Sequence, residues 1–326
     1  MHTTRRQLLV ALATASLAPA AMASDFPSRP IKILVGFAPG GSTDVVARFY
    51  AQKMSEILKA PVIVDNKPGA GQMVAIRALQ AAQADGYTLY LGTASALSQL
   101  PAIRSDLSYN TLKDFSMVGL MATAPGVVLV SPKLKVGSLR ELARLPEASA
   151  GTLNYASSGV GSASHLQTEY LKQVTGIKMA HIPFKADADI MREMYAGTVQ
   201  FGLTPAQGAM ASISSGKVKA LAVTGSHRLK SLPDVPSLKE LDFKGIEGID
   251  PYSYYGLVGP IGLPSDVVAK LNSAINKVSS DPAVIKQLRE HLNFEPEVGS
   301  PDRLRKFIQA DIDKWAAFGK LVKLTE

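Results

Sequence analysis

The chain has 326 residues, of which 46% are hydrophobic and 19% charged, and its formal net charge is +8. It contains no cysteine, which excludes a disulfide framework and attachment to lipid through a cysteine. Lysine and arginine are scattered, with no basic run interleaved with aromatic residues, so nucleic-acid binding is a poor interpretation. The length is sufficient for two α/β domains of ordinary size.

The first 23 residues have the pattern of an export signal. Arg5 and Arg6 form a basic region, residues 8–17 form a short apolar region, and Ala21-Met22-Ala23 is a small-x-small cleavage site. The paired arginines also resemble a twin-arginine signal, and the sequence leaves the Sec and Tat routes open. We expect residues 1–23 to be a signal peptide cleaved near Ala23 and the mature protein to reside in the periplasm.

Short apolar runs alternate with helical patterns along most of the remaining chain. This alternation with short links predicts an α/β fold in which each domain has a mostly parallel sheet flanked by helices. The expected strands are 31–37, 62–65, 87–93, 127–131, 153–157, 179–184, 199–204 and 220–224. The expected helices are 43–58, 74–83, 164–173, 187–196 and 205–214.

The C-terminal part has a different pattern, with three helices predicted over 265–279, 281–291 and 301–322 and no parallel strand between them. Such helices are typical of a layer that packs back onto an existing domain. We therefore expect one crossing between lobes near 122–125 and a return near 249–252. This assigns 24–123 plus 250–326 to lobe 1 and 124–249 to lobe 2.

Two similar loops each follow an expected strand and open a helix. The first is Phe37-Ala38-Pro39-Gly40-Gly41-Ser42-Thr43-Asp44, and the second is Ser157-Ser158-Gly159-Val160-Gly161-Ser162-Ala163-Ser164. Glycines let the backbone N–H groups converge, and serine and threonine add hydroxyl donors. The helix behind each loop presents unpaired N–H groups and a positive dipole end, which together favour an anion. The pair predicts a small acid held between two lobes.

With these motifs, the chain resembles a Bug-type (TctC-like) solute-binding protein of a tripartite tricarboxylate transporter. The similarity covers nearly all of the expected mature chain and rests on segments 26–31, 38–48, 64–71, 155–162 with His165-Leu166, and 232–237. The resemblance implies a two-lobed periplasmic binding protein of type II-like fold, hinged by two crossings and closing on a carboxylate. It also implies partners, namely a large and a small integral membrane transporter subunit, and no chemical transformation or cofactor. We expect a monomer.

The resemblance places the ligand shell in the two loops and in the turn after the third strand. Together with two positions near the lobe 2 loops, the expected ligand-binding residues are Phe37, Ala38, Gly40, Gly41, Ser42, Thr43, Thr93, Ala94, Ser95, Ser157, Ser158, Gly159, Gly161, Ser162, Phe184 and Thr204.

Three titratable residues near these loops are assigned supporting roles. Asp44 lies in the first helical turn, where the dipole favours a carboxylate that would oppose a nearby anionic ligand, so we expect it to hold the loop. His165 is more typical of a hydrogen-bonding residue than of a ligand contact. Asp187 is a candidate partner for a ligand ammonium group. The histidines have no metal-ligand spacing, so a metal site is not expected.

The stretch 199–206 departs from many family members because it contains no acidic residue. A desolvated ammonium group needs a carboxylate partner, so this departure disfavours an amino acid, although Asp187 or Asp189 could supply the charge. The Tyr252–Tyr255 cluster, with Phe37 and Phe184, could line the site instead. We therefore expect an aliphatic or aromatic dicarboxylate.

Two alternatives remain open at this level. The chain could be an exported sensor subunit that signals to a membrane partner, or a serine hydrolase using Ser158 or Ser162 with His165, although it lacks a G-x-S-x-G elbow. Segment 66–71 also looks like a phosphate loop, but it lacks the Gly-Lys-Ser/Thr ending.

Overall fold

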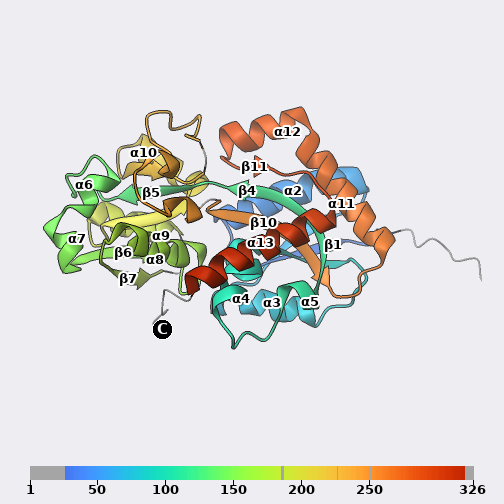
Figure 1. The fold of residues 1–326 in the computed structure, drawn as a ribbon. Helices are drawn as coiled ribbons and strands as arrows, with labels where there is room; N and C mark the ends of the chain where they lie inside the picture. Colours follow the sequence, from blue (N-terminus) through green and yellow to red (C-terminus); the bar gives the residue numbers. More distant parts are fainter. Residues whose placement is uncertain (1–25, 185–186, 226, 250, 320–326) are drawn as a thin grey trace, which may run out of the picture.

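The computed structural model describes residues 26–184, 187–225, 227–249 and 251–319 (Figure 1). The expected signal peptide lies outside the described residues. Two sheets, each flanked by helices, form the left and right halves of the molecule in Figure 1. The expected α/β fold with two lobes is therefore confirmed.

The first sheet has the strand order β11-β4-β10-β3-β1-β2. Strands β1, β2 and β3 are parallel, while β10 runs antiparallel to both of its neighbours, β3 and β4. Four of the six strands (β1 to β4) therefore share one direction, and β10 and the short β11 run the other way. The strands are β1 Ile31–Val35, β2 Val62–Asn66, β3 Thr88–Thr93, β4 Phe115–Ala124, β10 Ser253–Pro260 and β11 Glu295–Pro296.

The second sheet repeats the central arrangement of the first. Its order is β7-β6-β8-β5-β9, with β5 antiparallel to both neighbours and the other four strands in one direction. In each sheet the strand that follows a crossing from the other lobe runs antiparallel to its neighbours, which is why neither sheet is wholly parallel. The strands are β5 Gly126–Val130, β6 Leu153–Ser157, β7 Met179–Pro183, β8 Phe201–Pro205 and β9 Lys219–Val223.

The helices pack on these sheets and account for much of the buried apolar surface. In the first lobe they are α2 Ser42–Leu58, α3 Met73–Gln80, α4 Leu100–Ile103, α5 Thr111–Asp114, α11 Ser265–Ser280, α12 Pro282–Lys286 and α13 Pro301–Gly319. In the second they are α6 Leu139–Ala143, α7 Pro146–Ala150, α8 Ala163–Thr175, α9 Asp187–Ala196 and α10 Ala206–Ser214. Short 3-10 or π segments are η1 Ala70–Gln72, η2 Ser95–Gln99, η3 Leu238–Glu240, η4 Ile246–Ile249 and η5 Gln287–His291.

The C-terminal helices pack back onto the first lobe, as expected. Buried residues of α11, such as Leu271 and Ile275, join the core formed with α2, β1 and β3, and Leu304 and Ile308 of α13 join a second core cluster of the same lobe. The expected elements include neither β4 nor β10. Strand β4 is an almost continuous apolar run that can be mistaken for a helix segment, and β10 is buried along its whole length and so lacks the alternation that marks a half-buried strand.

The two crossings are packed against each other. Strand β4 ends at Ala124 and β5 begins at Gly126, while β10 enters the first sheet at Ser253. A Cβ on Gly126 would lie 2.7 Å from Cδ2 of Tyr252, so only glycine allows this approach. Helix α13 makes a further connection, because Trp315 and Phe318 pack against Tyr170 of α8, with ring centroids 6.0 and 4.7 Å apart.

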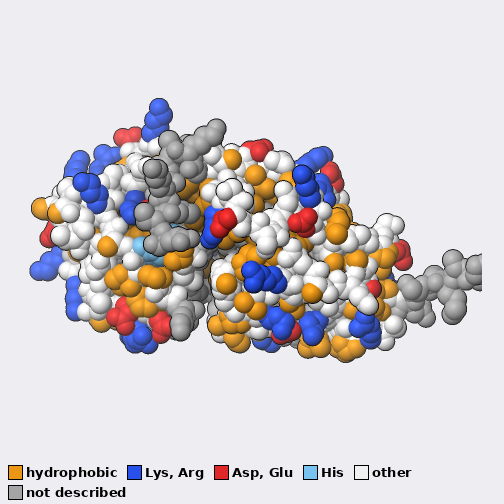
Figure 2. All heavy atoms as spheres, turned by 90° about the horizontal axis from the view of Figure 1, so that it is seen from below, with side chains coloured by type: hydrophobic (Ala, Val, Ile, Leu, Met, Phe, Trp, Pro, Cys, Tyr) orange, Lys and Arg blue, Asp and Glu red, His pale blue; other side chains and the backbone are white. Residues whose placement is uncertain are grey.

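Lysine and arginine side chains are interspersed with aspartate and glutamate on the face shown in Figure 2, with no continuous basic patch there. None of the helices in the described part of the chain is both long and apolar enough to cross a bilayer.

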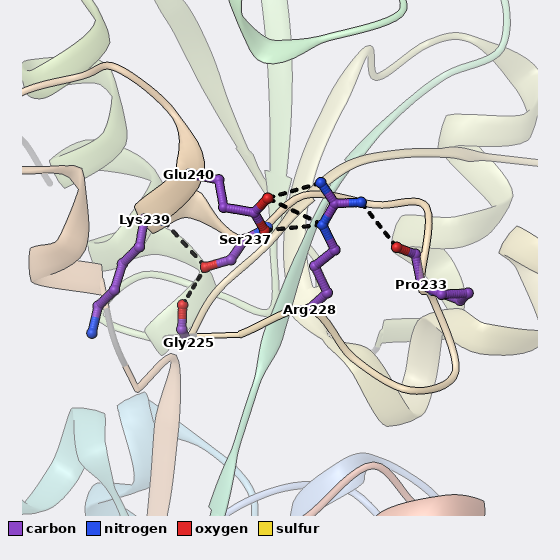
Figure 3. A network of polar contacts seen from close by, with 6 residues as sticks. All are labelled: Gly225, Arg228, Pro233, Ser237, Lys239 and Glu240. Atoms are coloured by element: carbon purple, nitrogen blue, oxygen red, sulfur yellow. Dashed lines mark hydrogen bonds and ion pairs between the residues drawn. The ribbon is translucent and has the colours of Figure 1, made fainter.

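The loop after β9 is held by a polar network (Figure 3). The Arg228 guanidinium donates to both carboxylate oxygens of Glu240 and to the Pro233 carbonyl, at 2.8 to 3.1 Å. Ser237 caps η3, and its hydroxyl donates to the Gly225 carbonyl at 2.5 Å. The Arg228 hydrogen bonds lower the pKa of Glu240 to about 2. This network fixes the connection that precedes the return crossing.

Candidate functional site

A cavity of about 280 Å³ lies between the two sheets, where the loops at the carboxyl ends of β1, β3, β6 and β8 meet the start of β10. Both lobes contribute to its wall. The lining residues are Phe37, Ala38, Pro39, Gly40, Gly41, Ser42, Thr43, Thr93, Ser95, Ser158, Ala163, Pro205, Tyr252, Ser253 and Tyr255. None of these described lining residues carries a charge.

The first loop is held by the buried carboxylate of Asp44. Its Oδ2 accepts from the Gly40 amide at 3.0 Å and from Arg48 Nε at 2.9 Å, and its Oδ1 accepts from Asn66 Nδ2 at 2.9 Å. Asn66 also donates to the Phe37 carbonyl at 3.0 Å. Burial raises the pKa of Asp44, but the hydrogen bonds from Arg48, Gly40 and Asn66 outweigh it and leave this pKa below its ordinary value. Asp44 therefore shapes the loop from behind and is not among the residues that line the cavity.

The amides of the first turn of α2, Ser42 and Thr43, have no acceptor within the helix and lie at the cavity wall. The Gly41 N-cap makes no side-chain capping bond, which leaves these amides without a side-chain cap. Ser42 Oγ donates to Gln207 Oε1 at 2.9 Å, and this bond joins α2 of the first lobe to α10 of the second.

Thr93 and Ser95 line the inner wall of the cavity and are hydrogen-bonded to buried polar side chains behind it. Gln72 Nε2 donates to Thr93 Oγ1 at 3.0 Å and to Ser95 Oγ at 2.8 Å, and the Tyr90 hydroxyl donates to Gln72 Oε1 at 2.8 Å. The hydroxyl oxygens of Thr93 and Ser95 lie 2.9 Å apart. All four side chains are buried.

The second loop uses its own side chains to hold its backbone. Ser162 caps α8 by accepting from the His165 amide at 3.3 Å, and the Ser158 amide donates to Ser164 Oγ at 3.0 Å. Ser157 Oγ accepts from the Gly159 amide at 3.1 Å. Of these serines only Ser158 lines the cavity.

His165 supports this loop from behind. Its Nδ1 accepts from the Gly161 amide at 3.0 Å, and its ring stacks on His181 at a centroid distance of 4.2 Å. Burial lowers the pKa of both imidazoles, that of His181 to about 4, with the neighbouring His165 adding to the effect. Glu169 raises both pKa values, and its ion-pair partner Lys172 lowers them.

The structure brings most of the expected first-lobe residues to one cavity. Nine of the expected ligand-binding residues line it, namely Phe37, Ala38, Gly40, Gly41, Ser42, Thr43, Thr93, Ser95 and Ser158. Seven do not, namely Ala94, Ser157, Gly159, Gly161, Ser162, Phe184 and Thr204.

The residues outside the lining have local reasons for their positions. Ser157 and Ser162 bond to their own loop, and Phe184 packs against the apolar cluster that contains Ile190. Thr204 is buried in β8, one residue before the lining residue Pro205. The Asp187 side chain lies outside the described residues.

The prediction from sequence omits several residues of the site. Tyr252, Ser253 and Tyr255 belong to the return crossing, which the sequence indicates only as an alternative aromatic lining. Gln207 lies in the first turn of α10, and no local motif marks it. Gln72 lies in a glycine-rich turn 21 residues before its partner Thr93.

No group of three or more His, Cys, Asp or Glu side chains that could hold a metal is found within the part of the chain that the structure describes. The site combines an uncharged cavity with helix N-termini and hydroxyl groups from two lobes. This arrangement defines a two-lobed α/β binding protein.

The comparisons with known proteins identify the family. The Tripartite tricarboxylate transporter family receptor profile matches residues 46–324, and the chain belongs to this family. A UPF0065 protein of Bordetella pertussis is 35% identical over 95% of this chain and 94% of its own length. Protein BugT of the same organism is 33% identical over 94% of this chain and 93% of its own length. The chain is thus a Bug-type, TctC-like solute-binding protein.

Solved structures agree with this assignment. The periplasmic binding protein BugD is 30% identical, with a TM-score of 0.81 over 90% of this chain and 98% of its own. R. palustris Rpa4515 with adipate is 28% identical, with a TM-score of 0.83 over 90% of this chain and 97% of its own. MatC from Rhodopseudomonas palustris with bound malate is 29% identical, with a TM-score of 0.81 over 90% of this chain and all (100%) of its own.

Proposed function

We propose that this protein captures a short aliphatic dicarboxylate in the periplasm and delivers it to the membrane subunits of a tripartite tricarboxylate transporter. The observation that carries the proposal is the uncharged cavity between the lobes, with the first turn of α2 on one side and Ser158 near the start of α8 on the other. Two structurally similar proteins are described with malate and with adipate, which supports the dicarboxylate class.

The chemistry of the wall suits an acceptor-only ligand. Amide groups of a helix N-terminus and hydroxyl groups donate hydrogen bonds, and the helix dipole favours negative charge. A hydrogen bond to a charged group contributes about 1.5–3 kcal/mol net. Micromolar affinity needs only about −8 kcal/mol, so a few such bonds in each lobe suffice after ordering costs.

The cavity volume favours a short ligand. At about 280 Å³ the cavity lies near the lower end of the range for small-molecule sites. Malate and adipate, the ligands of the two similar structures, are both aliphatic dicarboxylates, so we favour the aliphatic class.

The charges around the cavity disfavour an amino-acid ligand. No described lining residue is acidic, and Asp189 is paired with Arg192 at 2.9 Å. A ligand ammonium group would therefore lack a carboxylate within the described wall.

The lobes that enclose the ligand are residues 24–123 plus 250–326 and residues 124–249. Closure of these lobes around the ligand, favoured by the bond from Ser42 to Gln207 across the cleft, would present a distinct surface to the transporter. The protein acts as a monomer with no cofactor and performs no reaction. In the described residues Nδ1 of His165 accepts from the Gly161 amide and is therefore not free to act as a base on Ser158 or Ser162.

A thermal-shift and calorimetric screen of residues 24–326 tests the proposal. Malate and adipate should bind, whereas phthalate and glutamate at the same concentration should not. A ligand at 100 times its Kd stabilises the folded state by about 2.7 kcal/mol, which gives a clear shift in Tm.

Two matched variants locate the binding site. Ser158→Ala, at the cavity wall, should weaken malate or adipate binding, and Ser215→Ala, at an exposed position just after α10, should not. Binding of glutamate in place of both dicarboxylates, or equal effects of the two variants, would refute the proposal.

A further inference from the structure

Gln72 lies behind the cavity in an unusual backbone conformation. Its φ is 76°, in the left-handed region that glycine favours, and it follows Gly71 at φ 60°. Such a conformation is strained for a residue with a Cβ and persists only where the surroundings impose it. Gly36 approaches the residue closely, since a Cβ added to Gly36 would lie 2.6 Å from the Gln72 Cβ. Glycine would adopt this conformation without strain, but it would lack the hydrogen bonds that the Gln72 side chain makes.

The Gln72 amide determines where the hydrogens of the inner wall point. Its two N–H groups are used on the oxygens of Thr93 and Ser95, at 3.0 and 2.8 Å. Each hydroxyl oxygen therefore already accepts one hydrogen bond. If Ser95 then donates to Thr93 at 2.9 Å, the Thr93 oxygen accepts twice and has no lone pair left for a ligand.

With Ser95 donating to Thr93, the Thr93 hydroxyl hydrogen has two acceptors available to it, Gln72 Oε1 and a ligand oxygen. Without a ligand it donates to Gln72 Oε1 at 3.2 Å, the longest bond in this group. When a ligand oxygen arrives, the hydroxyl can rotate toward the cavity and leave no buried group unpaired, because the Tyr90 hydroxyl still donates to Oε1 at 2.8 Å. Thr93 is also the member of the pair with a remaining exposed fraction, 4% against 0% for Ser95.

Tyr90 pairs with the oxygen of the amide. Its ring is fully buried and its hydroxyl donates to Oε1, while Nε2 faces the two hydroxyl groups. In the opposite orientation Oε1 would face Thr93 and Ser95, and both hydroxyl groups would donate to it. The wall would then offer lone pairs to the ligand in place of a hydrogen.

We propose that Gln72, whose Oε1 accepts from Tyr90, is a positioning residue that makes Thr93 a hydrogen-bond donor and thereby sets a preference for a carboxylate over the corresponding amide. This inference rests on the proposed function, since it concerns the same cavity. It explains in addition how the site distinguishes two ligands of the same shape, one with an acceptor-only carboxylate and one with an amide N–H donor.

The test compares the Kd of malate or adipate with the Kd of its monoamide by titration calorimetry. The variants Gln72→Met and Tyr90→Phe remove the amide and the hydroxyl without changing charge. Gln80→Met, at an exposed glutamine on α3, and Tyr109→Phe, whose buried hydroxyl donates to the Ala96 carbonyl, are the matched controls. Urea unfolding of each variant establishes that it is folded.

The wild type should bind the dicarboxylate at least ~10-fold more tightly than the monoamide, since one unpaired or mismatched buried group costs about that factor or more. Gln72→Met and Tyr90→Phe should each reduce this ratio by about 3-fold or more, and the controls should keep it. A loss of affinity for both ligands by the same factor would show a purely structural role and overturn the inference. If the wild type binds neither dicarboxylate, the proposed function fails and this inference with it.

Discussion

Replacement of Asp44 by alanine should destabilise the protein, while the same replacement of an exposed aspartate should not. Asp44 is 3% exposed, and its carboxylate accepts from Gly40, Arg48 and Asn66. The bonds from the Gly40 amide and from Asn66 contribute about 1.5 kcal/mol each, the low end for an ionised acceptor. The Arg48 side chain is 52% exposed, so its pair contributes at most about 1 kcal/mol. The sum is about 3–4 kcal/mol.

Urea unfolding at pH 7 measures this change, and a calorimetric scan should show Tm lower by roughly 5–6 °C. The control is Asp106→Ala, which removes an exposed carboxylate paired with Arg104 and should leave the stability nearly unchanged.

The pH dependence provides a second check. The pKa of Asp44 is lower in the folded protein than in the unfolded chain, so its contribution is present above the unfolded value of about 4 and is lost as pH falls through the folded value. The wild type and the Asp44→Ala variant should therefore converge in stability at low pH. A difference below about 1 kcal/mol at pH 7, or one that persists unchanged in acid, would refute the structural role assigned to Asp44.

Three other substitutions test individual contacts. Burial lowers the pKa of His181 to about 4, so as pH falls the unfolded chain binds a proton before the folded protein does. The free energy of unfolding should therefore fall by about 2 kcal/mol between pH 7 and pH 4. His181→Gln should flatten this dependence in urea unfolding, and parallel pH curves for wild type and variant would contradict it. Gln207→Ala removes the hydrogen bond from Ser42 across the cleft and should weaken dicarboxylate binding about 2- to 10-fold in calorimetry. The Tm of the unliganded protein should stay unchanged, and a lower Tm would assign the bond to stability instead. Gly36→Ala places a Cβ 2.6 Å from that of Gln72 and should lower the free energy of unfolding by about 1–3 kcal/mol; no effect would show that this turn is free to shift.

Local patterns predict the parts of the site that are contiguous in the chain. The loop from Phe37 to Thr43 is expected from its glycines, its hydroxyl groups and the apolar strand before it, and all seven of its residues line the cavity. The second loop is expected in the same way, but of its predicted residues only Ser158 reaches the cavity. Its other serines bond to their own backbone, a choice that depends on rotamers and not on residue type.

The amino-acid sequence by itself determined the α/β class, the alternation of strands and helices, the two helix-opening loops and the family, because periodicity and turn chemistry are properties of neighbouring residues. Only the tertiary structure decided that β5 and β10 insert antiparallel into the two sheets and that Tyr252 and Tyr255, rather than Phe184, line the cavity. It also placed Gln72 behind Thr93 and Gln207 against Ser42. These contacts join residues 21 and 165 positions apart, and their geometry is set by how the sheets and helices pack. No pattern within a single segment of the chain carries that information.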